Sequence, residues 1–362
     1  MSMQPLRDNV AIAIDGGGIK GLIISRGLSR LERELGGIPL IKQNKIKVLA
    51  GTSTGSLISM GLSIGMTSDQ ISDIYVKFGQ DVFPPLSPVW LPDFIRKGYE
   101  MFLMVTRHSL YTTDKLKQFL RNVVAEHTGN PDFTLGELKQ RLAPDQAVIF
   151  TTVNIAQRRT RFIKSYQDKW ADWKVWEAAL ASSVAPVALP VYARQEGNQV
   201  VYYTDGGVGS YGNPAYVATE EVITYQHHAP KDVTILSFGT GWIDETNYVA
   251  AVGKPTNWAG LDWAMNAPLV VTADATRTQS IDIIDEYGPQ QIDFRRFQFP
   301  LVKDINSDAY ADKATYNQMV QLGEALGDNI VNNHYAPIDP QYDPEGISDA
   351  IDSFRQAKQA KA

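Results

Sequence analysis

The chain contains no cysteine among its 362 residues, so it forms no disulfide, no thiolate nucleophile and no cysteine-ligated zinc site. It also has no excess of basic residues: 34 Lys and Arg against 40 Asp and Glu give a net charge of −6, which argues against a general binder of nucleic-acid backbones. No apolar run approaches the ~20 residues that a membrane-spanning helix needs. With 44% hydrophobic residues, the composition is that of a globular protein of one large or two average domains.

The N-terminus carries no recognisable targeting segment. Residues 1–9 are polar, the apolar run at 10–14 is too short for a secretory signal, and no small-residue cleavage site follows it. The sequence therefore leaves two locations open. One is the cytoplasm or the periphery of a membrane, and the other is secretion after removal of a leader.

Short apolar runs alternate with helical periodicity in the first half of the chain. Runs at 10–14 and 46–50 predict buried strands, and apolar spacing at 22–35 and 56–64 predicts helices. This alternation predicts an α/β fold with a mainly parallel central sheet flanked by helices. Further strands are expected at 146–152, 199–204 and 233–238, and further helices at 70–78, 113–127, 135–142, 172–183, 213–224 and 346–361. Beyond Trp258 the pattern is mostly helical.

The segment Gly51-Thr52-Ser53-Thr54-Gly55 fits the Gly-x-Ser-x-Gly nucleophile elbow, with a predicted strand before it and a predicted helix after it. A serine on such a sharp turn crowds the residues two positions away on each side, so both must be small. The turn would project the Ser53 hydroxyl at the N-terminus of a helix, where a developing anion is favoured. A tight turn without chemistry explains the pentapeptide alone equally well.

A second glycine-rich loop, Asp15-Gly16-Gly17-Gly18-Ile19-Lys20-Gly21, also follows an apolar strand and opens a helix. Consecutive glycines let backbone N–H groups face an anion closely. One interpretation is an oxyanion hole built from the amides near Gly17 and Gly18 together with that of Thr54. Lys20 would add positive charge nearby or simply be solvated.

The same loop also satisfies the dinucleotide-binding pattern through Gly16, Gly18 and Gly21. That interpretation requires an acidic residue at the end of a second strand, roughly 20 residues further on. The acidic residues found there, Glu32 and Glu34, lie inside a predicted helix. The dinucleotide interpretation also leaves the 51–55 segment unexplained, so the oxyanion interpretation is favoured.

A serine nucleophile needs a base. None of the five histidines lies where an apolar strand passes into a loop, which is the usual place of a catalytic base; they are His108, His127, His227, His228 and His334. Asp205 does follow an apolar strand, and Gly206-Gly207 comes next. Placed there, the carboxylate could take the serine proton directly, although an ordinary Asp-Gly turn is the simpler interpretation of Asp205 by itself.

Taken together, these segments resemble the patatin-like phospholipase family. The loop at 15–21, the elbow at 51–55 and the Asp-Gly-Gly at 205–207 are similar to its three motifs, and they occur in the family's order. The stretches at 181–186, 213–214 and 239–241 are similar as well. The resemblance runs from about residue 10 to 241 and more weakly towards 333; departures are Lys20 for the commoner Arg, Val184 for Ala and Ser56 for Gly.

The resemblance implies a three-layer architecture and hydrolysis of lipid acyl esters by a Ser-Asp dyad, with neither metal nor cofactor. Carried onto this sequence, Ser53 is the nucleophile and Asp205 the base, and water hydrolyses an acyl-Ser53 intermediate. Backbone groups of Gly16, Gly17, Gly18 and Thr54 would form the oxyanion hole. The implied domain extends over 10–335, between an N-terminal tail at 1–9 and a C-terminal tail or helix at 336–362.

An aromatic-rich segment at about 84–110 is a candidate lid over a lipid-binding site. Trp90 and Phe94 suit contact with a membrane or micelle surface, and the basic residues Arg96, Lys97 and Arg107 flank them. Packing of this segment in the core is the competing interpretation. Lys20, Trp90 and Phe94 are the expected substrate contacts.

Other functions remain open within the same fold. The expected partner is a lipid at a membrane or micelle surface, and some bacterial relatives are membrane-degrading defence effectors activated by cyclic nucleotides, so a small-molecule activator is a further hypothesis. An acyltransferase or thioesterase acting on carrier-bound acyl groups would usually need a histidine partner. A nonenzymatic binding protein would not need the intact Ser53 and Asp205 pair.

Overall fold

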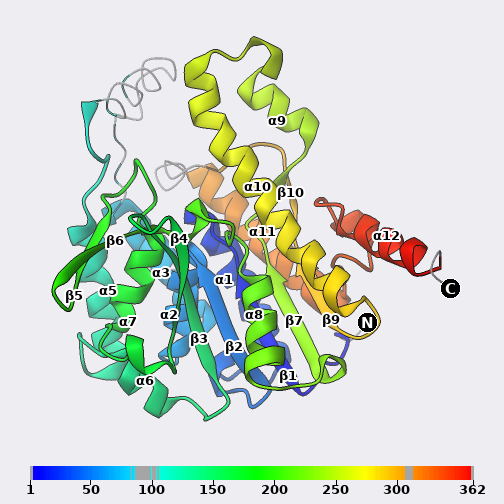
Figure 1. Ribbon diagram of the computed structural model, residues 1–362, viewed down its shortest axis with the longest axis horizontal. Helices are drawn as coiled ribbons and strands as arrows, with labels where there is room; N and C mark the ends of the chain where they lie inside the picture. Colours follow the sequence, from blue (N-terminus) through cyan, green and yellow to red (C-terminus); the bar gives the residue numbers. More distant parts are fainter. Residues whose placement is uncertain are drawn as a thin grey trace.

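The computed structural model describes residues 3–82, 84, 86, 99, 103, 106–305 and 313–359 (Figure 1). It has a central, mostly parallel sheet with helices on both faces, as the alternation of apolar runs predicts. Most of the predicted lid at about 84–110, including Trp90 and Phe94, lies outside the described residues.

Five parallel strands form the middle of the sheet. In spatial order they are β3 (Ala147–Asn154), β2 (Ile46–Thr52), β1 (Asn9–Ile14), β7 (Val233–Phe238) and β9 (Asp293–Phe297). Their side chains are almost entirely buried, because helices cover both faces of a parallel sheet. The carboxyl ends of these strands consequently meet at one edge, from which the candidate site is built.

Three further strands join the sheet by antiparallel pairing. The strand β4 (Arg159–Lys164) pairs with β3 over Ile149–Asn154, and β6 (Gln199–Asp205) pairs with Thr152, Val153 and Asn154. The outer strand β5 (Tyr192–Glu196) pairs with β6. A separate parallel pair joins the short strands β8 (Trp242–Ile243) and β10 (Pro300–Leu301).

The helices form the two outer layers. One core cluster holds Val10, Ile12 and Ile14 of β1, and the other holds Ala11 and Ala13, as expected when successive strand residues point to opposite faces. The first face is covered by α1 (Gly21–Glu34), α2 (Thr54–Ser63), α3 (Ser68–Val82), α5 (Thr113–Thr128), α6 (Leu135–Arg141), α7 (Val175–Ser183) and α11 (Lys313–Asn332). The second is covered by α8 (Ala215–Glu220), α10 (Gly260–Tyr287) and α12 (Ile347–Gln359).

The second half of the chain departs in places from the sequence prediction. The mostly helical pattern after Trp258 holds for α10, α11 and α12 but misses β9, a buried strand that contains two consecutive arginines. The helix expected at 213–224 is α-helical only over α8 and continues as a π-helix at Glu221–Tyr225. The helix α9 (Glu245–Val252) buries none of its residues, and together with the first half of α10 it projects past the carboxyl edge of the sheet (Figure 1).

The two ends of the chain contact the body of the fold. Near the N-terminus, the Arg7 guanidinium donates to the carbonyl oxygens of Pro230 and Gln291 at 3.0 and 2.7 Å. Near the C-terminus, Glu345 is fully buried against β9. The division at residues 9 and 335 stays a prediction. Within the part of the chain that the structure describes, no helix has the length and apolarity needed to cross a bilayer.

Candidate active site

Ser53 occupies the turn between β2 and α2. Its backbone has φ 53° and ψ −122°, a left-handed conformation that is strained for a residue with a side chain. The turn is tight because the chain is small on both sides: a Cβ added at Gly51 would lie 2.2 Å from the Gly55 carbonyl oxygen, and one added at Gly55 would lie 2.1 Å from that of Ile14. The serine is thus held, half-buried, at the N-terminus of α2.

Two serines of α7 fix the Ser53 backbone. Its N–H donates to the Ser182 hydroxyl at 3.0 Å, and its carbonyl oxygen accepts from the Ser183 hydroxyl at 3.0 Å. The Ser182 hydroxyl also bonds Ser56 Oγ at 2.6 Å. These contacts give the stretch at 181–186 a structural role that its sequence did not reveal, namely to pin the strained turn from a neighbouring helix.

Asp205 ends β6 and is only 5% exposed. Its Oδ1 accepts a hydrogen bond from the Gly207 N–H at 2.7 Å, whereas Oδ2 has no hydrogen-bond partner among the described residues. Burial raises the pKa of Asp205 to about 6, and the neighbouring Ser53 hydroxyl and Gly207 N–H partly offset that rise. Ser53 therefore neighbours a buried carboxylate that can accept a proton near neutral pH and whose Oδ2 has no hydrogen-bond partner among the described residues.

The glycine-rich loop leads from β1 through a 3₁₀ turn at Gly18–Lys20 into α1. Among the described residues, the N–H groups of Gly17, Gly18 and Thr54 have no hydrogen-bond acceptor, so they are free to meet a ligand. The Gly16 N–H is already engaged, because it donates to the Gly212 carbonyl oxygen at 2.9 Å.

Thr240, two residues after β7, contacts this loop and supports it. Its hydroxyl donates to the Gly16 carbonyl oxygen at 2.8 Å. It also touches Gly17 so closely that a Cβ there would lie 2.2 Å from Thr240 Oγ1. The second glycine of the loop is therefore required by contact with Thr240, in addition to any role of its N–H.

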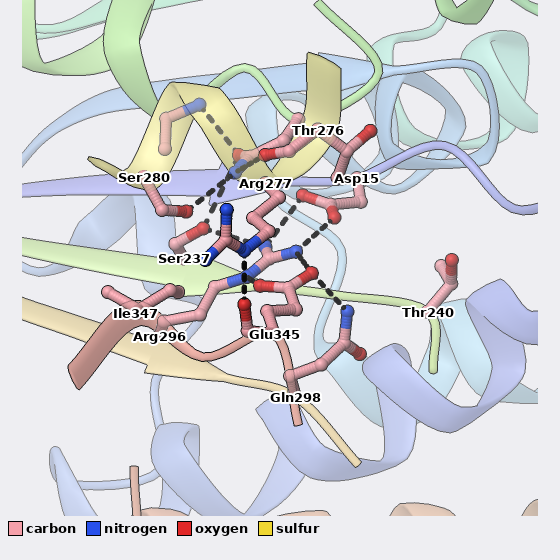
Figure 2. Close-up of polar contacts among 12 residues, drawn as sticks. Asp15, Ser237, Thr240, Thr276, Arg277, Ser280, Arg296, Gln298, Glu345 and Ile347 are labelled. Carbon is pink, nitrogen blue, oxygen red and sulfur yellow. Dashed lines mark hydrogen bonds and ion pairs between the residues drawn. The ribbon is translucent and has the colours of Figure 1, made fainter. Parts of the chain in front are cut away.

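Asp15, the first residue of the loop, belongs to a buried ion network (Figure 2). The Arg296 guanidinium donates to both Asp15 carboxylate oxygens, at 2.9 and 2.6 Å, and to both oxygens of Glu345, each at 2.9 Å. Burial raises the pKa of Asp15 to about 6, against the opposing effect of Arg296. Burial acts in the same direction on Glu345, but there the charge of Arg296 prevails and holds the pKa below its usual value.

Of the remaining predicted residues, Trp90 and Phe94 lie outside the described part of the chain, and Lys20 lies at the end of the glycine-rich loop. Lys20 forms an ion pair with Asp304, with an Nζ to Oδ1 distance of 2.8 Å. Among the histidines, His127 bonds the Val123 carbonyl oxygen within its own helix and His334 stacks on Tyr342. No group of three or more His, Asp or Glu side chains within the described residues is placed to hold a metal ion.

Apolar surface lies near the candidate site. Val208, three residues after Asp205, is 53% exposed, and Trp263 and Leu269 of the projecting half of α10 are 53% and 59% exposed. α10 reaches the site itself, where Thr272 Oγ1 lies 3.5 Å from the Gly207 carbonyl oxygen, although its hydroxyl donates to the Pro268 carbonyl oxygen of its own helix at 2.8 Å. A small apolar cavity of about 40 Å³ opens between α2, α3 and α5, with Leu57, one turn after Ser53, in its wall.

Comparisons with known proteins show what this chain is similar to. The sequence model of the family described as patatin-like phospholipase matches residues 12–219, more than half of the chain. A cGAMP-activated phospholipase of Vibrio cholerae is 27% identical over 88% of this chain and 90% of its own length, and Patatin-04/09 of Solanum tuberosum is 23% identical over 87% and 82%. The crystal structure of VipD from Legionella pneumophila is 14% identical, covers 89% of this chain and 68% of its own, and has a TM-score of 0.38.

Proposed function

This chain belongs to the patatin-like phospholipase family, and we propose that it hydrolyses the carboxylic esters of lipids with Ser53 as nucleophile and Asp205 as base. One observation carries the proposal: a serine on a strained turn at a helix N-terminus neighbours a buried carboxylate whose Oδ2 has no hydrogen-bond partner in the described part of the chain. The matched region contains both residues.

In the first half-reaction, Asp205 removes the Ser53 hydroxyl proton as Oγ attacks the ester carbonyl carbon. The carbonyl oxygen becomes an oxyanion, and the free N–H groups of Gly17, Gly18 and Thr54 hold it. Gly16 does not donate to the oxyanion, because its N–H is bound to the Gly212 carbonyl oxygen; that bond instead holds the loop in place. The positive end of α2 stabilises the same charge.

The reaction closes without a further catalytic group. The C–O bond of the tetrahedral intermediate breaks, the leaving alkoxide takes the proton from Asp205, and an acyl-Ser53 ester remains. Asp205 is then a carboxylate again, so it can deprotonate a water molecule that attacks the acyl carbon. The carboxylic acid leaves and Ser53 regains its proton.

The surroundings favour a lipid as substrate. Val208, Trp263 and Leu269 present apolar side chains to solvent at the carboxyl edge of the sheet, where an acyl chain or membrane surface would approach. Phospholipids at a membrane or micelle surface are therefore the proposed substrate class.

A second proposal concerns activation. The Vibrio cholerae relative is named for its activation by cGAMP, and the similarity covers about nine-tenths of both chains. We therefore propose that a cyclic dinucleotide of this kind binds the protein and increases its hydrolase activity, so that the protein acts as a regulated, membrane-degrading enzyme.

The direct test measures fatty-acid release by mass spectrometry from mixed vesicles of phospholipids, glycolipids and acylglycerols, with and without cGAMP. Wild type is compared with Ser53→Ala and with Ser59→Ala, a matched control on the same helix whose buried hydroxyl has no partner among the described residues. We expect release by wild type and Ser59→Ala, and none by Ser53→Ala. Equal release by Ser53→Ala would refute the nucleophile, and release unchanged by cGAMP would refute activation.

A further inference from the structure

The buried ion network fixes the glycine-rich loop at its first residue. Asp15 ends the strand β1, and its N–H is bound to the Phe238 carbonyl oxygen at 3.0 Å. Both carboxylate oxygens are held by the two terminal nitrogens of Arg296, a bidentate pair that fixes direction as well as distance. The orientation of the Asp15 side chain therefore fixes the position and direction in which the backbone of the loop leaves β1.

Arg296 in turn is fully hydrogen-bonded. Its NH1 also donates to the Ser237 hydroxyl at 2.9 Å, while Nε and NH2 donate to Glu345, so all five of its N–H donors are used (Figure 2). The side chains of Arg296 and Glu345 are fully buried. A lysine in this place would keep the charge but would lose the planar, forked geometry.

The network reaches the loop by a second route. Gln298 donates from Nε2 to Glu345 Oε1 at 2.9 Å, and its Oε1 accepts from the Gly241 N–H at 2.8 Å. Gly241 follows Thr240, whose hydroxyl bonds the Gly16 carbonyl oxygen. Glu345 is thus connected to the start of the loop through Arg296 and Asp15. It is also connected to Thr240, which contacts the loop, through Gln298 and Gly241.

We propose that Arg296 and Glu345 are positioning residues for the oxyanion hole, which hold the amides of Gly17 and Gly18 in the orientation that the transition state requires. The inference rests on the proposed hydrolase function. Both residues lie outside the 12–219 region that the family model matches, so the C-terminal part of this chain completes the loop of the matched region. Glu345 stands two residues before α12, and Arg277 of α10 adds a donor to its carbonyl oxygen at 2.5 Å.

The adjacent residue provides a matched control. Arg295 is as buried as Arg296 and forms a bidentate pair with Asp293 at 2.9 and 2.7 Å, but its remaining bonds go to the carbonyl oxygens of Gln4 and Pro5, away from the loop. Arg295→Lys and Arg296→Lys therefore each remove a buried bidentate pair between a guanidinium and an aspartate. A merely structural role predicts the same outcome for both.

The experiment compares both lysine variants and Glu345→Gln with wild type on a soluble 4-nitrophenyl ester, with folding checked by circular dichroism and Tm. We expect Arg296→Lys to lower kcat about 100-fold with little change in KM, because misplaced oxyanion donors affect the transition state more than binding. Glu345→Gln should lower kcat about tenfold, the lower end of the range for residues that orient a site. Arg295→Lys should retain wild-type kcat despite a similar loss of Tm.

A readout independent of activity is the amide spectrum of protein labelled with ¹⁵N-glycine. The signals of Gly17 and Gly18 should shift in Arg296→Lys and not in Arg295→Lys. Unshifted loop signals with wild-type kcat in folded Arg296→Lys, or equal effects of the two lysine variants, would overturn the positioning role. Shifted loop signals in a protein whose wild type cleaves no ester, with or without cGAMP, would instead support positioning and refute the hydrolase function.

Discussion

Thr52 and Asp205 lie opposite consecutive residues of β3, Thr151 and Thr152. The strand β4 occupies the other edge of β3 over this stretch. The strands β2 and β6 therefore share one edge of β3 and meet end to end, running in opposite directions. This meeting brings Asp205 next to Ser53, the residue that follows Thr52.

The raised pKa of Asp205 predicts the acid limb of the pH profile. A base must be charged to accept the serine proton, and burial raises the pKa of this carboxyl to about 6. We expect kcat/KM for a soluble ester to be constant above that pH and to fall about tenfold per unit below it. Asp15 has a pKa raised to the same range, so a steeper limb would report protonation of both carboxyls. Activity that stays constant down to pH 4 would contradict the role of Asp205 as base.

Asp205→Asn should abolish activity and stabilise the fold at neutral pH. The native pKa lies above the unfolded value of 3.8, so the charged form disfavours folding above pH 6, and that cost disappears as pH falls towards 4. A rise of about two pKa units corresponds to up to about 3 kcal/mol in the free energy of unfolding. Asparagine keeps an acceptor for the Gly207 N–H without the charge.

Urea denaturation of wild type and Asp205→Asn at pH 7.5 and pH 4 measures this difference. The variant should be more stable at pH 7.5, and its advantage should vanish near pH 4, where the wild-type carboxyl is protonated in the native state. A variant that is less stable than wild type at pH 7.5 would show that the buried charge of Asp205 does not destabilise the folded protein.

The sequence predicted the parts of the site that depend on local pattern. The apolar strands and the glycines around Ser53 follow from near-neighbour sterics, and Gly51 and Gly55 do make the close approaches expected of them. Asp205 was inferred from its place at the end of a strand, as if that strand ran parallel to the others. The strand β6 is antiparallel, and the carboxylate reaches the site because of its register with β3.

Parts that depend on distant pairing were not predictable. The segment that forms β9 contains Arg295 and Arg296, and arginines in an apolar run usually indicate a surface segment. Both are buried here because each has an acidic partner, one of which, Glu345, comes from a part of the chain taken for a tail. Similarly, the free amides of Gly17 and Gly18 and the engaged amide of Gly16 depend on Gly212 and Thr240, which the sequence does not connect to the loop.

Gly55→Ala tests the steric basis of the elbow. The new Cβ would lie 2.1 Å from the Ile14 carbonyl oxygen, a backbone atom of β1, so no change of side-chain rotamer can relieve the overlap. We expect a loss of about 3 kcal/mol or more in the free energy of unfolding, together with loss of activity.

The control is Gly260→Ala at the start of α10, where the added Cβ meets no described atom within 4 Å. This change should leave the free energy of unfolding unaltered or raise it by up to about 1 kcal/mol. Equal stability of the two variants, measured by urea denaturation, would contradict the close packing of the elbow.

The apolar surface of α10 predicts a substrate-dependent effect. Trp263 and Leu269 are exposed on the half of the helix that projects past the carboxyl edge of the sheet (Figure 1). If they enter a lipid surface, the variant Trp263→Ser with Leu269→Ser loses the burial of two side chains, each worth about 1.5–3 kcal/mol when complete, so hydrolysis of phospholipid vesicles should fall at least about tenfold. Hydrolysis of a soluble ester should not change, because the tested side chains lie outside the dyad and loop.

The control is Ile38→Ser, which removes a 47% exposed side chain from the loop before β2, at the opposite edge of the sheet. The same fall on both substrates, or an equal effect of Ile38→Ser on vesicles, would exclude this helix as the lipid contact.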